Sequence, residues 1–209
     1  MPITVERAGL LTGCADELQT VCEHDVVLDI RNDPVLIELA HDIDARCRLR
    51  GSFQLRSGIV ADEYFDKYLF EADPQLLRRI TERMVALVPE DTEMLGGLEL
   101  GGIPLVTMLS QLTGLPSLFV RKAAKAYGTQ QLAEGGDVQD RRVVLVEDVI
   151  TTGGAVVAAT EQLRSRGAIV DTVICAIDRS TPGINQLPSV GVAVRPVLTK
   201  QLLDTVHQQ

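Results

Sequence analysis

Two stretches of the chain carry apolar side chains at helical spacing, and each stretch begins with Asp-Pro. An aspartate side chain can accept hydrogen bonds from the unpaired N–H groups of a first helical turn, and proline fits the first helical position. Asp33-Pro34 and Asp73-Pro74 therefore predict two helix starts, with Gly51 closing the first helix and Pro89 stopping the second. The two apolar stripes are Leu36, Leu39, Ile43 and Cys47, and then Leu77, Ile80, Met84 and Leu87.

Short runs of apolar and β-branched residues between the helical stretches predict strands. The predicted strands are Ser52–Leu55, Met94–Leu100, Ser117–Val120, 142–147, Ile169–Ile177 and Val190–Val197. Further helices are predicted over 103–113 and in a segment with Val156, Ala159 and Leu163 on one side, which Gly167 ends. Strands that alternate with helices form βαβ units. The pattern therefore predicts an α/β fold with an open, mostly parallel, twisted sheet flanked by helices.

Two segments fit this alternation less well. Residues 123–141 are polar, contain glycine and lack periodicity, which predicts a long loop, with a hairpin inside it as an alternative. Residues 1–32 allow a helix around Cys14–Cys22 and a strand near Val26–Ile30. A single domain accommodates all of these elements in a chain of 209 residues.

Composition and charge narrow the class of protein. A hydrophobic fraction of 45% indicates a globular chain. We expect no membrane span, because no apolar run reaches about 18 residues, and no secretion signal, because no basic segment followed by an apolar one opens the chain. The four cysteines form no Cys-x-x-Cys pair, which favours reduced thiols in the cytoplasm over a zinc site. The net charge of −9 opposes binding to nucleic acid or to an anionic membrane.

The end of the predicted strand 142–147 carries the most chemical information. Apolar residues lead to Glu147 and Asp148, and Thr151-Thr152-Gly153-Gly154 follows before a helical pattern begins. Parallel sheets bind ligands at the carboxyl ends of their strands, and a glycine-containing turn before a helix presents N–H groups to an anion. Carboxylates would repel a lone phosphate, so the pair predicts a ligand that also carries hydroxyls, a sugar phosphate. A connecting turn with solvated acids is the alternative interpretation.

Three cations follow the predicted strand Ser117–Val120, namely Arg121, Lys122 and Lys125. In an acidic protein they form a local positive patch at a strand end, where Arg and Lys commonly bind phosphate or pyrophosphate. A solvated surface loop is the alternative. The glycine-containing segment that follows would suit a lid that closes over a reactive intermediate. The chain has neither Gly-Lys-Ser/Thr nor Gly-x-Gly-x-x-Gly, which argues against a nucleotide P-loop and a dinucleotide site.

These motifs resemble those of the type I phosphoribosyltransferases and, within them, of the orotate phosphoribosyltransferase family. The resemblance covers roughly residues 50–180. In that family the acid-rich loop binds the ribose 5-phosphate of phosphoribosyl pyrophosphate, and the Arg-Lys-x-x-Lys loop binds the pyrophosphate. Leu55-Arg56-Ser57-Gly58 with Tyr64-Phe65-Asp66 is similar to the family's hood over the base, and Arg179 matches the position of an arginine that binds the orotate carboxylate.

The resemblance implies transfer of a 5-phosphoribosyl group to orotate with Mg²⁺ held mainly by the substrate, in a homodimer. It implies the family's fold in one domain, with residues 1–70 as an N-terminal segment and hood and residues 71–209 as a core with a mobile loop at 123–137. The implied catalytic residues are Lys125, Glu147 and Asp148, and the implied orotate-binding residues are Tyr64, Phe65, Thr151 and Arg179. The residues implied in binding phosphoribosyl pyrophosphate are Arg56, Arg121, Lys122, Lys125, Tyr127, Glu147, Asp148, Val149, Ile150, Thr151, Thr152, Gly153, Gly154 and Ala155.

The chain departs from the family pattern at several positions. Tyr127 stands where the family usually has histidine, Arg56 replaces a lysine, and Ile59 replaces a common arginine. Leu100-Gly101-Gly102 lacks the Tyr-Lys of some members. Three alternatives therefore stay open: the same transfer to another base, a non-catalytic regulator that senses phosphoribosyl pyrophosphate, and an inactive paralogue.

Overall fold

The computed structural model describes residues 33–54, 58–122, 133–181 and 183–208 of the chain. The chain divides into two compact units, Met1–Ile30 and Arg31–Gln209, and all described residues belong to the second. The helix and strand predicted around Cys14–Cys22 and Val26–Ile30 lie outside the described residues. No described helix combines the length and the apolar character that a membrane crossing needs.

A six-stranded sheet forms the centre of the second unit, in the order β5-β4-β3-β6-β7-β8. Its pairs are parallel except for the antiparallel pair of β4 with β5. This arrangement confirms the predicted α/β fold with a mostly parallel sheet. In the described part of 123–141 the one strand, β5, pairs with β4 and not with a second strand of that segment. The strands are β3 (Met94–Leu98), β4 (Ser117–Val120), β5 (Ala133–Glu134), β6 (Val143–Ile150), β7 (Thr172–Asp178) and β8 (Ala193–Thr199).

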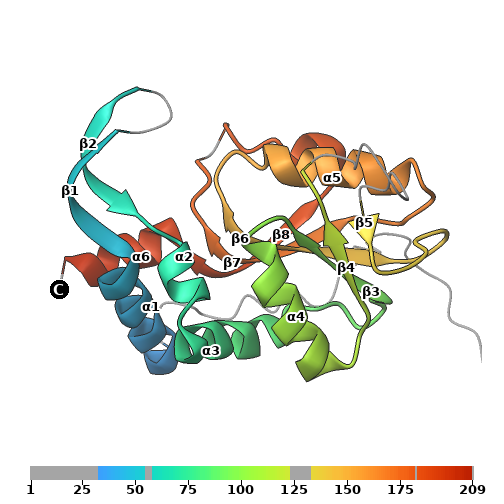
Figure 1. Ribbon diagram of the computed structural model, residues 1–209, viewed down its shortest axis with the longest axis horizontal. Helices are drawn as coiled ribbons and strands as arrows, with labels where there is room; N and C mark the ends of the chain where they lie inside the picture. Colours follow the sequence, from blue (N-terminus) through green and yellow to red (C-terminus); the bar gives the residue numbers. More distant parts are fainter. Residues whose placement is uncertain (1–32, 55–57, 123–132, 182, 209) are drawn as a thin grey trace, which may run out of the picture. The chain divides into compact units, whose positions relative to one another are not determined.

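Helices cover both faces of this sheet (Figure 1). Helices α3 (Pro74–Val85) and α4 (Gly102–Thr113) lie on one face, and α5 (Gly154–Arg164) lies on the other. Right-handed crossovers produce this result, because the chain moves from β3 to β4 in one direction and from β6 to β7 in the other. The start of α4 packs very close to the sheet, since a Cβ on Gly102 would lie 2.4 Å from the carbonyl oxygen of Val146.

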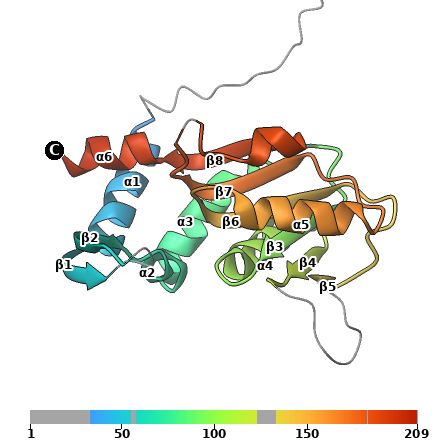
Figure 2. The same ribbon diagram turned by 90° about the horizontal axis from the view of Figure 1, so that it is seen from above.

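A separate antiparallel hairpin of β1 (Arg48–Gln54) and β2 (Val60–Phe65) projects beside the sheet (Figure 1). Its base contacts α1 (Pro34–Cys47), α2 (Tyr68–Glu71) follows it, and the last helix, α6 (Lys200–His207), packs against α1 (Figure 2). The short helical turn η1 (Leu187–Val190) precedes β8. An isolated two-stranded hairpin is only marginally stable. Packing at the base of the β1–β2 hairpin is therefore what stabilises it.

Ion pairs tie the base of the hairpin to both neighbouring helices. Arg48 donates to Asp44 of α1, with 2.9 Å from its Nε to Oδ1, and pairs with Glu63 of β2 at 3.2 Å. His207 of α6 lies 2.9 Å from Asp44 through Nδ1, and Asp204 is 3.6 Å from Arg48. Because Asp44 is buried, these partners offset the cost of taking its charge out of water.

The predicted helix starts are confirmed at Asp33 and Asp73, whose side chains accept N–H hydrogen bonds from the first turn. The predicted end at Gly51 is wrong: α1 ends at Cys47 and Gly51 lies inside β1. The helix stops early because Arg48 begins the pairing with Phe65 of β2. In the second stripe, Ile80 and Met84 are buried as predicted, whereas Leu76 takes the inward place predicted for Leu77.

Most strand bounds needed adjustment. Ser117–Val120 is confirmed, and the strand predicted at Met94 ends at Leu98. The strand predicted over 142–147 continues to Ile150, while β7 begins at Thr172 rather than Ile169, which makes only an isolated bridge. The strand predicted at Val190 begins at Ala193, after η1, and helix α6 was not predicted at all.

Candidate active site

The acidic pair lies within strand β6, not in a loop after it. Glu147 is paired with Cys175 of β7, and the pairing continues through Val149 and Ile150. These two β-branched residues extend the strand past the acids and past its predicted end at residue 147. Neighbouring side chains of a strand point to opposite faces. Asp148 is fully buried, whereas Glu147 is partly exposed.

Three groups surround the Asp148 carboxylate. The ammonium of Lys67, which caps the start of α2, lies 2.6 Å from Oδ2, and the N–H of Val149 donates to Oδ1. Glu71 of α2 is also buried, and its Oε1 and the Oδ2 of Asp148 both lie against Gly101. Burial, and then its proximity to the Asp148 carboxyl, raise the pKa of Glu71 to about 8, so Glu71 carries a proton near pH 7.

Lys67 and Glu71 were not among the predicted site residues. Burial works to lower the pKa of Lys67, but the hydrogen bond and charge of Asp148 outweigh it, and the pKa is raised. Lys67 therefore remains an ammonium. The local signal was weak, because both residues belong to a charged and aromatic stretch that also fits a solvated surface helix.

Glu147 is the second acid of the site. Burial, and then the charge of Asp148, raise the pKa of Glu147 well above its ordinary value. Its Oε2 atom is buried and has no hydrogen-bond partner within the part of the chain that the structure describes. An unpaired acceptor of this kind is costly and suits a hydroxyl donor from a ligand.

The threonine and glycine segment connects β6 to α5. Gly153 has a φ of 77°, the left-handed conformation that glycine adopts readily, and a Cβ there would lie 2.8 Å from Leu187. The carbonyl of Thr152 accepts from the N–H of Gln186 at 3.1 Å, which fixes the loop. Helix α5 has no side-chain cap at its start. The N–H of Gly154 makes only a long contact of 3.5 Å with Thr152 Oγ1. A helix start of this kind suits an anion, and the phosphate site at Thr151–Ala155 stays a prediction.

The cations Arg121 and Lys122 follow β4, on the other side of β3 from the acids. The N–H of Lys122 donates to Glu99 at 3.1 Å, and the buried Nε of Arg121 has no partner among the described residues. A hollow of about 90 Å³ lies between these cations and α5, and its lining includes Arg121, Lys122, Glu99, Ala155 and Ala158. Arg56, Lys125 and Tyr127 lie outside the described residues.

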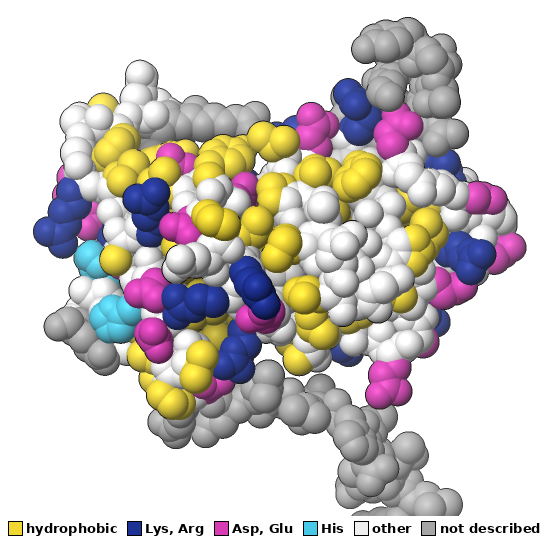
Figure 3. All heavy atoms as spheres, turned by 60° about the horizontal axis from the view of Figure 1, so that its bottom comes forward, with side chains coloured by type: hydrophobic (Ala, Val, Ile, Leu, Met, Phe, Trp, Pro, Cys, Tyr) yellow, Lys and Arg dark blue, Asp and Glu magenta, His cyan; other side chains and the backbone are white. Residues whose placement is uncertain are grey.

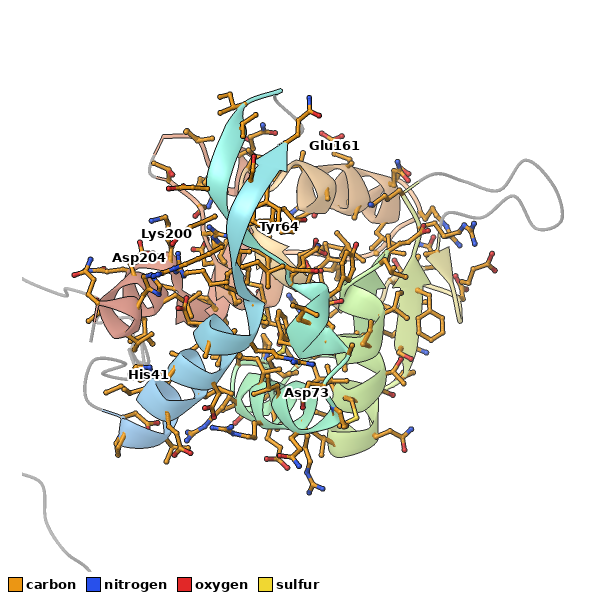
Figure 4. All side chains as sticks on the ribbon, turned by 60° about the vertical axis from the view of Figure 1, so that its left-hand side comes forward. His41, Tyr64, Asp73, Glu161, Lys200 and Asp204 are labelled. Carbon is orange, nitrogen blue, oxygen red and sulfur yellow. The ribbon has the colours of Figure 1, made fainter. Side chains whose placement is uncertain are left out.

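The predicted base-binding residues lie in two places. The guanidinium of Arg179 stacks 5.0 Å from the ring centre of Phe65, and its backbone N–H donates to the carbonyl of Ile150, which places it beside the loop that begins at Thr151. Burial, and then the charge of Arg48, lower the pKa of Arg179. Tyr64 instead packs on Phe53 of the hairpin at 5.5 Å and is largely exposed (Figure 4).

Comparisons with known proteins agree on one family. Residues 72–185 match the phosphoribosyl transferase domain. The chain is 65% identical over 170 residues to an orotate phosphoribosyltransferase of a Nocardioides species, covering 81% of this chain and 95% of the relative. It is 41% identical over 148 residues to an orotate phosphoribosyltransferase of Methanocella arvoryzae, covering 71% of this chain and 85% of the relative.

Solved structures give the same result. An orotate phosphoribosyltransferase of Mycobacterium tuberculosis in complex with inorganic phosphate superposes with a TM-score of 0.72 at 29% identity, covering 82% of this chain and 99% of that one. The same enzyme in complex with phosphoribosyl pyrophosphate gives a TM-score of 0.68 at 27% identity, covering 82% and 99%. With its sheet, its acidic strand end and these relatives in agreement, the chain belongs to the orotate phosphoribosyltransferase family.

Proposed function

We propose that this protein transfers the 5-phosphoribosyl group of phosphoribosyl pyrophosphate to orotate, giving orotidine 5′-monophosphate and pyrophosphate in pyrimidine biosynthesis. The observation that carries the proposal is that the acids of β6 lead directly into the uncapped start of α5, and that the first turns of α5 share a hollow with the cations that follow β4. Family membership supplies the substrates, since the relatives are orotate phosphoribosyltransferases.

Each of the three features matches one part of phosphoribosyl pyrophosphate. The N–H groups and hydroxyls of Thr151–Ala155 bind the 5-phosphate, while Val149 and Ile150 contribute backbone. Glu147 and Asp148 accept hydrogen bonds from the ribose hydroxyls. The pyrophosphate is bound by Arg56, Arg121, Lys122, Lys125 and Tyr127. A transition state with an oxocarbenium-like ribose gains most from cations that stabilise the departing pyrophosphate.

Orotate would bind where Arg179 meets Phe65. A half-buried guanidinium whose pKa is lowered by burial lacks a full counter-charge, and a ligand carboxylate would supply one. Thr151 and Tyr64 complete the proposed base site, with the hairpin β1–β2 as its hood. Tyr64 would have to leave Phe53 to touch the base.

Mg²⁺ would accompany the pyrophosphate and be held mainly by substrate oxygens, the coordination that this ion commonly has with phosphate ligands. We further propose a cytoplasmic homodimer with residues 1–70 as N-terminal segment and hood, and residues 71–209 as core. The proposed mobile loop is 123–137.

A nucleic-acid-binding regulator has less support. The chain has a net charge of −9, and on the face shown in Figure 3 the basic side chains are interspersed with acidic ones. Proteins that bind nucleic acid gather cations on one face.

The function is tested by following the loss of orotate absorbance with phosphoribosyl pyrophosphate and Mg²⁺. We expect turnover with orotate and little with uracil or the purine bases, and no turnover without Mg²⁺. Lys125→Ala should lower turnover far more than it weakens orotate binding, because the lysine acts on the leaving group. Transfer to another base but not to orotate would overturn the proposal.

A further inference from the structure

The ion pair of Lys67 with Asp148 joins two distant parts of the chain inside the site. Lys67 comes from the turn between β2 and α2, and Asp148 comes from the central strand β6. The nitrogen and oxygen are 2.6 Å apart, the Asp148 side chain is fully buried, and that of Lys67 is 32% exposed. A buried carboxylate without a partner would lose its proton only at great cost. Lys67 supplies the opposite charge that offsets the burial of the Asp148 carboxylate and fixes the position of its Oδ2.

The Asp148 oxygen that pairs with Lys67 also packs tightly against Gly101. A Cβ built on Gly101 would lie 1.5 Å from Asp148 Oδ2 and 2.6 Å from Glu71 Oε1, so both oxygens press against the same glycine. Glu71 carries its proton and adds no charge near pH 7. Of the charged groups described around Asp148, only Lys67 makes an ion pair with it.

We propose that Lys67 is a positioning residue for the ribose, which acts on the substrate through Asp148 rather than by touching it. This inference rests on the proposed function, in which Asp148 accepts hydrogen bonds from the ribose hydroxyls. A carboxylate held at a fixed angle binds such donors well, and a rotated one does not.

The test is a double-mutant cycle with Asp148, read by calorimetric titration of phosphoribosyl pyrophosphate into the full chain with Mg²⁺. Lys67→Met removes the charge and keeps the length of the side chain, and Lys67→Arg keeps the charge. We expect Lys67→Met to weaken binding by about 10- to 100-fold, the value of one hydrogen bond to a charged group. Lys67→Arg should weaken binding of phosphoribosyl pyrophosphate less than Lys67→Met does.

The matched control is Lys200→Met, since Lys200 pairs with Asp204 on α6, away from β6 (Figure 4). It should bind as the unaltered protein does. In the Asp148→Asn background, Lys67→Met should cost almost nothing further, because Lys67 then has no carboxylate to hold. That double variant also has no uncompensated buried charge, so the cycle stays readable if Lys67→Met alone folds poorly.

Each other outcome overturns a different statement. No binding by the unaltered protein overturns the proposed function and the role of Lys67 with it. Binding by the unaltered protein and equally tight binding by Lys67→Met overturn the role of Lys67 alone. A loss of the same factor in both backgrounds would show that Lys67 contacts the ligand directly, which also overturns the positioning role.

Discussion

Gly101 illustrates how a single residue can be required by its neighbours. In the sequence, Leu100-Gly101-Gly102 is a departure from the Tyr-Lys that some family members carry. In the structure this glycine lies against Asp148 and Glu71, at a distance that no side chain permits. Its backbone angles are ordinary, with a φ of −68°, so the requirement comes from space and not from conformation.

Gly101→Ala should therefore displace Asp148 while leaving the backbone fold intact. We expect kcat/KM for phosphoribosyl pyrophosphate to fall by about 100-fold, the effect of moving a catalytic group by roughly 1 Å. Gly114→Ala at the other end of α4 is the control. Its φ of 75° strains alanine, but the added Cβ meets no atom within 4 Å, so kcat/KM should not change. Steady-state kinetics of both variants provide the measurement, and unchanged kinetics for Gly101→Ala would contradict the packing described here.

At the scale of elements, helix starts that depend on neighbouring residues were predicted correctly, whereas strand ends that depend on pairing with another strand were not. The Asp33 and Asp73 caps act within one turn, so their helices could be located from sequence. The extension of β6 to Ile150 depends on its pairing with β7, which no local pattern contains. Helix α6 escaped prediction because only Leu203 and Val206 are buried in it.

The same distinction applies to the candidate site. The acid pair, the glycine turn and the cations are contiguous motifs and were predicted. Lys67 and Glu71 join the site only because α2 folds against the end of β6, a contact between residues far apart in sequence. The stacking of Arg179 on Phe65 is equally non-local, although each residue was predicted separately.

The ion-pair network at the base of the hairpin gives a prediction for that element. Arg48→Met should lower the free energy of unfolding by about 3 kcal/mol, because it leaves the buried Asp44 without its guanidinium. Arg78→Met, which removes an exposed pair with Glu82 on α3, should hardly change the unfolding midpoint. Urea unfolding of both variants would decide the matter, and equal midpoints would show that the network does not hold the hairpin.

At the scale of the whole molecule, the chain holds three carboxyl groups together while carrying a net charge of −9. Burial, and then neighbouring acids, raise the pKa values of Glu71 and Glu147. Where the folded state keeps protons on such groups and the unfolded state has lost them, the free energy of unfolding falls as the pH rises. The site is therefore assembled at the expense of stability in neutral and alkaline solution.

The pH dependence of unfolding should reveal this cost. The pKa of the Glu71 carboxyl is 4.5 when the group is exposed in the unfolded chain and about 8 in the folded chain. Between these two pH values the folded chain binds a proton that the unfolded chain has lost. The contribution of Glu71 to stability is full below pH 4.5 and falls as the pH rises to about 8, where it levels off. The amide side chain of the Glu71→Gln variant cannot ionise. The free energy of unfolding of this variant, relative to the unaltered protein, should therefore rise across this window by on the order of 1 kcal/mol per pH unit.

Urea unfolding from pH 5 to about pH 9 measures the difference, with Glu161→Gln on the exposed face of α5 as the control (Figure 4). A constant difference across the window would mean that Glu71 is ionised beside Asp148, and that Lys67 balances two carboxylates instead of one.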